Sequence, residues 1–184
     1  MLSQEARSAI LKIARDAARA AVGGQKPPAD PVEHPELQGR QGAFVTLKTH
    51  GALRGCIGRF VSEEPLWETV RQVAVQSATE DPRFYANRLT PRDMKGLEIE
   101  VSVLSPLERI ENPLDIELGV HGIYVRRGWR AGCFLPQVAT ETGWSKEEFL
   151  SHCCAGKAGL PADAWKDPET EVLVFTAEII EEHK

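Results

Sequence analysis

The residues LRGCIGRF, from Leu53 to Phe60, set one cysteine between two glycines, with an arginine toward each end. In a β-strand Arg54, Cys56 and Gly58 share one face, because alternate residues point to the same side of a sheet. A guanidinium near a thiol favours the thiolate, the form that a nucleophile, a redox sensor or a metal ligand uses. Gly58 then leaves space for a ligand, and Gly55 permits close approach from the opposite face. The same pattern is also typical of a bent strand with a buried cysteine.

Two other short segments carry polar groups that could join such a site. EDPRF places Asp81 at a helix end and Arg83 just beyond it, where they meet an anionic ligand or form a surface ion pair. GVHGI places His121 between two glycines, where a histidine acts as a base or a ligand, or simply tolerates a turn. The catalytic candidates are Cys56 and His121. The candidates for lining a cleft or binding a ligand are Arg54, Gly55, Gly58, Asp81 and Arg83.

These residues support two hypotheses about function. In the first, the chain is an enzyme or enzyme subunit whose cleft accepts a small anionic substrate. In the second, it is a non-catalytic module that binds a small molecule or a protein partner. Residue spacing does not assemble a complete set of nucleophile, base and orienting group, so the sequence favours the second hypothesis.

The remaining cysteines and the histidines do not predict a metal or cofactor site. Cys153 and Cys154 each stand four residues after an apolar residue, Phe149 and Leu150, so we expect both thiols to extend the buried stripe of a helix. No cysteines show CxxC spacing, and no histidines show the short spacings that chelate a metal. The chain also lacks the glycine-rich motifs that cradle phosphates. We therefore predict no metal and no bound cofactor.

Charge and hydropathy argue against several classes of protein. The chain has 184 residues and a net charge of -5, which disfavours the broad basic face that non-specific nucleic-acid binding requires. The basic run RRGWR, Arg126 to Arg130, is interpreted as a solvated hairpin tip. The first residues do not resemble a signal peptide, and no apolar run of about 18 residues predicts a membrane span. We expect a cytoplasmic protein.

Hydrophobic periodicity predicts the elements that hold these residues. It predicts helices from Ser3 to Val22 and from Ser62 to Asp81, and a third that begins at a capping box of Ser145 and Glu148. It predicts strands over 43–48, 53–60, 97–104, 123–127, 131–136 and 171–179. The order of hairpin, helix and strand thus occurs twice.

This repeated order predicts an α+β fold with two β-β-α-β subdomains, each with an antiparallel sheet and helices packed on the sheet. We expect a single domain, 1–184, whose subdomains span about 40–108 and about 119–182, beside an N-terminal helix. Cys133 follows Cys56 by 77 residues, and each cysteine follows a glycine in the second strand of its hairpin. We interpret this spacing as an internal duplication.

Several segments of the chain resemble those of a known family. LRGCIG, ATEDPRF, IEVSVLSPLERI, GVHGIYV, LPQVATETGWSKEEFLSHCCAGKAGL and EVLVFTAEIIEE are similar to motifs of the AMMECR domain family, known in bacteria and archaea as protein A of the AmmeMemoRadiSam system. The resemblance covers nearly the whole chain after Gly39. The family's hexamer stands intact from Leu53 to Gly58, whereas Cys133 stands where an aliphatic residue is expected.

The resemblance implies two subdomains with antiparallel sheet, and a hexamer near the cleft between them. It also implies two partners: a Memo-like protein, similar to extradiol dioxygenases, and a radical SAM protein. We therefore expect a small-molecule- or partner-binding component that acts with these proteins through a cleft near LRGCIG. The alternative is an enzyme or enzyme subunit that uses Cys56 and neighbouring arginine, histidine and aspartate residues on a small anionic substrate.

Overall fold

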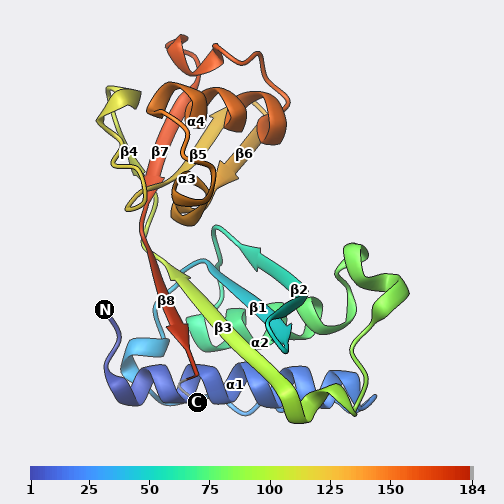
Figure 1. Ribbon diagram of the computed structural model, residues 1–184. Coiled ribbons are helices and arrows are strands. Elements are labelled where there is room, and N and C mark those ends of the chain that lie inside the picture. The colour runs from blue at the N-terminus through green and yellow to red at the C-terminus, as the bar shows by residue number, and fades with distance from the viewer. Residues whose placement is uncertain (183–184) are drawn as a thin grey trace. The chain divides into compact units, whose positions relative to one another are not determined.

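The computed structural model describes residues 1–182 and confirms the α+β fold with two four-stranded sheets. The chain forms two compact units, which Figure 1 shows as ribbons. The first unit comprises Met1–Leu104 together with the segment that begins at Glu178, and the second comprises Ser105–Ala177. Each unit contains one of the sheets and its own buried apolar cluster.

The sheet of the first unit has the strand order β2-β1-β3-β8. Its strands are β1 (Ala43–Thr49), β2 (Ala52–Arg59), β3 (Leu97–Leu104) and β8 (Ala177–Glu181). β1 pairs antiparallel with both β2 and β3, so the first strand of the predicted hairpin lies inside the sheet. The hairpin turns through His50 and Gly51, which both have positive φ, as a tight two-residue turn requires. β2 is therefore an edge strand, whose outer backbone groups need partners other than a strand.

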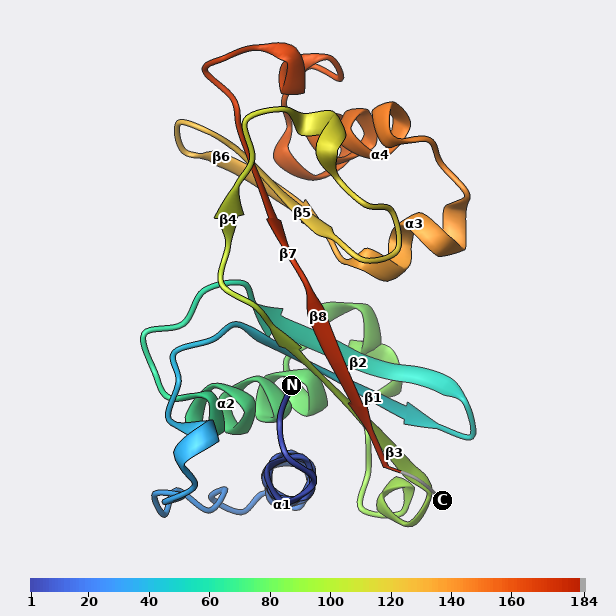
Figure 2. The ribbon, with the colours of Figure 1, turned by 90° about the vertical axis from the view of Figure 1, so that its left-hand side faces the viewer.

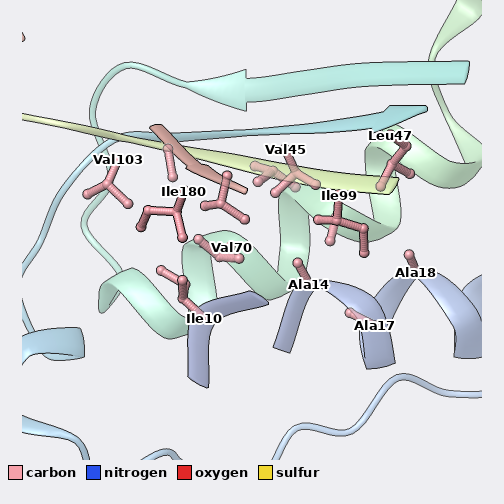
Figure 3. Close-up of a cluster of buried hydrophobic side chains, with 14 of the residues drawn as sticks. Ile10, Ala14, Ala17, Ala18, Val45, Leu47, Val70, Ile99, Val103 and Ile180 are labelled. Atoms are coloured by element: carbon pink, nitrogen blue, oxygen red, sulfur yellow. The ribbon is translucent and has the colours of Figure 1, made fainter. Parts of the chain in front are cut away.

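Two helices, α1 (Gln4–Val22) and α2 (Leu66–Thr79), cover one face of this sheet (Figure 2). Alternate residues of the strands, such as Val45, Leu47 and Ile99, are buried against them, as the strand pattern predicts (Figure 3). α1 contributes small side chains to this core, which let the helix lie close to its neighbours. These buried residues of α1 are Ala6, Ile10, Ala14, Ala17 and Ala18.

The helix starts follow local hydrogen bonding. α1 begins after Ser3, whose hydroxyl accepts the N–H of Ala6, and this confirms the predicted start. The predicted start of α2 at Ser62 is wrong, because α2 begins at Leu66. The Ser62 hydroxyl instead accepts the N–H of Glu64 at 3.2 Å and the hydroxyl of Thr69 at 2.7 Å.

The sheet of the second unit has the strand order β4-β7-β5-β6. Its strands are β4 (Glu108–Arg109), β5 (Gly122–Arg127), β6 (Arg130–Phe134) and β7 (Glu171–Phe175). β5 pairs antiparallel with both β6 and β7. The first strand of the second hairpin therefore also lies inside its sheet, as β1 does in the first unit.

Helical segments follow β6 in the second unit. α3 (Pro136–Thr142) begins at a proline that the sequence pattern assigned to the preceding strand. α4 (Lys146–Cys153) begins with the predicted capping box, in which Ser145 and Glu148 each accept the other's backbone N–H. A π-helical turn, Cys154–Ala158, completes this segment. Cys153 and Cys154 are fully buried, which confirms that they belong to the core.

Within residues 1–182, five short 3-10 helices connect the larger elements. They are η1 (Pro35–Leu37), η2 (Pro82–Asn87), η3 (Asp93–Gly96), η4 (Pro113–Asp115) and η6 (Ala164–Lys166). Two of them, η2 and η3, lie between α2 and β3, beside the residues that the sequence singled out.

The single strand predicted over 171–179 is wrong, because β7 and β8 belong to different sheets. Thr176 separates them: its N–H donates to Ser105 Oγ, and its carbonyl accepts the Ser105 N–H, both at 2.9 Å. The expected second subdomain, about 119–182, consequently differs from the second unit, Ser105–Ala177. The sequence pattern hides this break because apolar residues, Phe175 and Ala177, stand directly on both sides of Thr176.

Corresponding glycines of the two hairpins lie against helical backbone: Gly55 against α2, and Gly132 against the π-helical turn that follows α4. A Cβ added to Gly55 would be 2.0 Å from the carbonyl oxygen of Ser77 in α2. A Cβ added to Gly132 would be 2.4 Å from the backbone nitrogen of Ala158. Each glycine precedes a cysteine, Cys56 or Cys133, in the second strand of its hairpin. The internal duplication stays a prediction, and this shared contact supports it.

Both glycines should resist substitution by alanine. Because a backbone atom occupies the position of the added Cβ, Gly55→Ala and Gly132→Ala should each lower the free energy of unfolding by about 1–3 kcal/mol. Gly156→Ala is the control, since a Cβ there meets nothing within 4 Å, and we expect a change within about 0.5 kcal/mol. Urea denaturation measures all three variants. An unchanged midpoint for Gly55→Ala would contradict the close approach of α2 to β2.

Candidate functional site

Asp81 and Arg83 satisfy the outer backbone groups of Cys56 on the edge strand β2. The N–H of Cys56 donates to Asp81 Oδ2 at 2.9 Å. Arg83 Nη2 donates to the carbonyl oxygen of Cys56 at 3.0 Å. One side chain thus accepts and the other donates, as the backbone of a neighbouring strand does in a sheet. The two predicted motifs meet in this contact, which we call the edge clip.

The carboxylate of Asp81 is the buried centre of the edge clip. Only 3% of its side chain is exposed, and Arg83 donates to it from Nε at 3.0 Å and from Nη2 at 2.7 Å. The guanidinium of Arg83 and the backbone N–H groups of Cys56 and Arg83 lower the pKa of Asp81 to about 2. The pair is therefore not the exposed ion pair that the sequence left open, because its acidic partner lies inside the protein.

Arg54 connects β2 to the segment that contains η2 and η3. Its side chain is 12% exposed. Nη1 donates to Thr49 Oγ1 at 2.9 Å and to Asp93 Oδ1 at 3.3 Å. Nη2 donates to the carbonyl oxygens of Asn87 and Arg88, each at 3.3 Å. The guanidinium of Arg54 was expected to favour the thiolate of Cys56, but its hydrogen bonds instead hold the segment of η2 and η3 in place.

The thiol of Cys56 differs from the other three in its surroundings. Like Cys133 it is half-buried, but its Sγ accepts a hydrogen bond from the hydroxyl of Thr46 at 3.3 Å. Burial raises the pKa of Cys133 to about 11 and also raises the pKa values of Cys153 and Cys154. Among the four thiols, Cys56 has the setting that suits reaction or ligand contact best.

The expectation that Gly58 leaves open space is wrong, because the ring of Phe44 occupies it. A Cβ at Gly58 would be 2.2 Å from Phe44 Cγ and 2.5 Å from the carbonyl oxygen of Ala43. Phe44 is the cross-strand partner of Gly58, and its ring packs edge-on against Phe60 at 4.8 Å between centroids. The glycine is explained by packing across the hairpin, without a ligand.

His121 lies in the second unit, just before β5. Its Nδ1 accepts the N–H of Glu117 at 3.1 Å, so this nitrogen is occupied in a turn. The structure therefore gathers Arg54, Cys56, Asp81 and Arg83 in the first unit, whereas His121 belongs to a separate local arrangement.

Ser77 is a site residue that the sequence analysis did not identify. It is 1% exposed, and its hydroxyl accepts the N–H of Ile57 and donates to the carbonyl of Val45, both at 2.8 Å. α2 is therefore hydrogen-bonded to both strands of the hairpin. The sequence held a signal for this contact, since Ser77 is a polar residue at an apolar position of the helix.

A cavity of about 1190 Å³ lies elsewhere in the first unit and is lined by residues of α1, the β1–β2 turn, β3 and β8. Its lining includes Lys48, Glu100 and Arg15, and Cys56 is not part of it. Lys48 pairs with Glu100 at 3.1 Å, and the hydrogen bond to Glu100 raises the pKa of Lys48. Within residues 1–182, no group of three or more histidine, cysteine, aspartate or glutamate side chains is placed to hold a metal ion.

Comparisons with known proteins identify relatives over nearly the full chain. The model of the family described as AMMECR1 matches residues 11–180. A protein from Methanothermobacter thermautotrophicus is 44% identical, over 98% of this chain and 96% of that protein. A protein from Methanopyrus kandleri is 46% identical, over 87% of this chain and 78% of that protein. The crystal structure of an uncharacterized protein from Pyrococcus horikoshii is similar with a TM-score of 0.83 at 42% identity, covering 95% of this chain and 90% of that one.

The low pKa of Asp81 predicts a specific acid dependence of stability. Because its folded-state pKa lies near 2 and its ordinary value is 3.8, the ionised clip should contribute about 2 kcal/mol above pH 4 and lose it as the pH falls toward 2. Asp81→Asn should therefore be less stable than the wild type at pH 6, with the difference shrinking below pH 4. Thermal unfolding from pH 2 to pH 7 measures it. A difference that stays constant over this range would exclude the clip as its source.

The four thiols should differ in reactivity in the native protein. At pH 8, a thiol with a pKa of about 11 is ionised to about one part in a thousand, so Cys133 should react slowly with Ellman's reagent. Cys153 and Cys154 should react only after unfolding, because both are buried. We expect one fast thiol, which Cys56→Ser removes and Cys133→Ser leaves unchanged. Survival of the fast phase in Cys56→Ser would contradict this assignment.

Proposed function

The chain belongs to the AMMECR1 family, and from this premise we propose that it is a binding component that acts with Memo-like and radical SAM proteins. In this proposal the contact is a cleft beside the LRGCIG strand, where a small molecule or a partner meets the half-buried Cys56. In this proposal the protein binds a small molecule or a partner and presents it, and the chemistry takes place on the partner proteins.

One observation carries this proposal: the charged side chains Arg54, Asp81 and Arg83 are already engaged in hydrogen bonds within the first unit. Asp81 accepts from Arg83 and from the Cys56 backbone, and Arg54 donates to three separate parts of the first unit. A general base needs a carboxylate whose proton affinity lies near the working pH, yet the pKa of Asp81 is lowered to about 2. These groups shape and stiffen the strand and are poorly suited to proton transfer.

The strand presents a face that α1 and α2 leave uncovered. Thr46 and Phe44 of β1 and Cys56 of β2 are half-buried on this face, opposite the buried Val45 and Leu47. The face combines an aromatic ring, a hydroxyl and a thiol, which suits a ligand or a protein surface of mixed polarity. In our proposal the cleft opens on these three side chains.

A second candidate function is an enzyme in which Cys56 acts as a nucleophile on a small anionic substrate. The hydrogen bond from Thr46 to Cys56 Sγ favours it, because a donated hydrogen bond stabilises a developing thiolate. This candidate ranks below the first because no base is hydrogen-bonded to the thiol among the described residues.

We further propose that the protein works in the cytoplasm. The composition of the chain supports this setting. The four free cysteines support it as well, because free thiols suit reducing conditions. Among residues 1–182, none of the helices is long and apolar enough to cross a membrane.

Direct binding to purified partners tests the proposed function. The Memo-like and radical SAM proteins of the same organism should each be titrated against this protein by calorimetry, and at least one should bind. Thr46→Arg places a long side chain beside Cys56 and should weaken binding at least tenfold without lowering the melting temperature. Ser8→Arg, on the exposed side of α1, is the matched control and should bind as the wild type does.

Cys56→Ser separates the two candidate functions in the same assay. A binding face tolerates the small change from thiol to hydroxyl, so affinity should stay within about threefold. Absence of binding to both partners would contradict the proposed function, as would equal affinities of Thr46→Arg and the wild type. Formation of a covalent adduct on Cys56 with a metabolite would favour the enzyme instead.

A further inference from the structure

We propose that the segment 82–96 docks an acidic segment of a protein partner through an arginine–tyrosine surface. This surface consists of the exposed side chains of Arg83, Tyr85, Arg88 and Arg92. The inference rests on the proposed function, since it names the chemistry of the partner that a binding component would meet. In Figure 1 the segment is the green part of the chain between α2 and β3.

The charge of this segment has the opposite sign to that of the chain. Residues 82–96 hold four cationic side chains and one carboxylate, whereas the whole chain has a net charge of -5. The one carboxylate, Asp93, already accepts from Arg54 and from the backbone and hydroxyl of Thr90. Neither Arg88 nor Arg92 pairs with a carboxylate within residues 1–182. Both guanidinium groups can therefore pair with carboxylates of a partner.

Aromatic rings hold two of the arginines in place. The guanidinium of Arg88 lies 4.7 Å above the ring of Tyr85, and that of Arg83 lies 5.5 Å from the centre of the Phe84 ring. A stacked guanidinium keeps its N–H groups at the rim of the ring, where they can donate to a planar carboxylate. Tyr85 is 53% exposed, and tyrosine and arginine are frequent anchors of protein interfaces.

Buried contacts fix the backbone of the segment before any partner binds. Arg54 donates to the carbonyls of Asn87 and Arg88 and to Asp93, and Leu89 is 7% exposed among the core residues. Arg83, through the edge clip, ties the start of the segment to β2. A surface that is ordered in advance loses less conformational entropy on binding. Arg54 is thus a positioning residue for this surface, which it does not itself form.

The same features favour an acidic protein segment over a nucleic acid. Base stacking needs free ring faces, and here an arginine covers one face of Tyr85. The negative charge of the whole chain also repels a long polyanion, whereas a short peptide with a few carboxylates meets mainly the local positive charge. Carboxylates interspersed with apolar side chains would match the alternation of arginine and aromatic residues.

A labelled peptide provides the direct test. The probe is a fluorescein-labelled peptide of alternating glutamate and leucine, titrated by anisotropy against the full chain, with a single-stranded oligouridine of equal charge in parallel. Arg88→Glu/Arg92→Glu should weaken peptide binding at least tenfold, and Tyr85→Ala should weaken it about threefold or more. Lys12→Glu/Arg40→Glu changes the net charge equally at exposed positions outside this segment and should bind as the wild type does. Melting temperatures establish that each variant is folded.

Each outcome bears on the docking surface. Selective loss of peptide binding in Arg88→Glu/Arg92→Glu supports it. Equal loss in the control variant, no peptide binding by the wild type, or tighter binding of oligouridine than of the peptide would overturn it.

The partner titrations separate this inference from the proposed function. If a Memo-like or radical SAM protein binds the wild type and Arg88→Glu/Arg92→Glu equally, the docking surface is wrong and the proposed function stands. If the peptide binds at this surface and neither protein binds, the proposed function fails alone.

Discussion

The unpaired backbone edge of β2 is the constraint around which the first unit is organised. The outer N–H and C=O groups of an edge strand need partners other than a strand, and at Cys56 these are the side chains of Asp81 and Arg83. Asp81 stands directly after α2, so the helix must end beside β2 for the carboxylate to reach Cys56. Gly55 permits this, because α2 lies where a Cβ would be. Gly55, the end of α2 and the buried Asp81 therefore act together, and they join two motifs that are separated in sequence.

Sequence reasoning identified most residues of this contact but did not predict their structural role. Residue type and spacing marked Arg54, Cys56, Asp81 and Arg83, because charged residues beside glycine and cysteine are unusual in a strand. A charge near a thiol suggests chemistry, but the direction of a long side chain depends on which backbone carbonyls lie within reach. Arg54 turns to Asn87 and Arg88, whose carbonyls are presented by irregular 3-10 structure. Such structure has no periodic signal, so this contact could not be predicted.

The strand pattern predicted the elements better than their pairing. Alternation of side chains located β1, β3 and both hairpins, because each sheet has one buried face. It did not separate β7 from β8, since apolar residues continue on both sides of the break at Thr176. The pattern also did not predict what fills the space beside Gly58, which is occupied by Phe44 of the neighbouring strand. Both questions depend on which strands lie side by side, and residue patterns within one strand carry no information about that.

The geometry of Arg54 explains why the motif has an arginine and not simply a cation. Its planar group reaches a hydroxyl, a carboxylate and two carbonyls at once, on Thr49, Asp93, Asn87 and Arg88. A lysine presents one compact ammonium group and cannot donate in these separate directions from one plane. The carbonyls come from the turn that precedes the exposed Arg92, and Asp93 comes just after it. The positive charge inside the motif therefore fixes the backbone from which the exposed arginines project, and in our proposal this is how it contributes to binding.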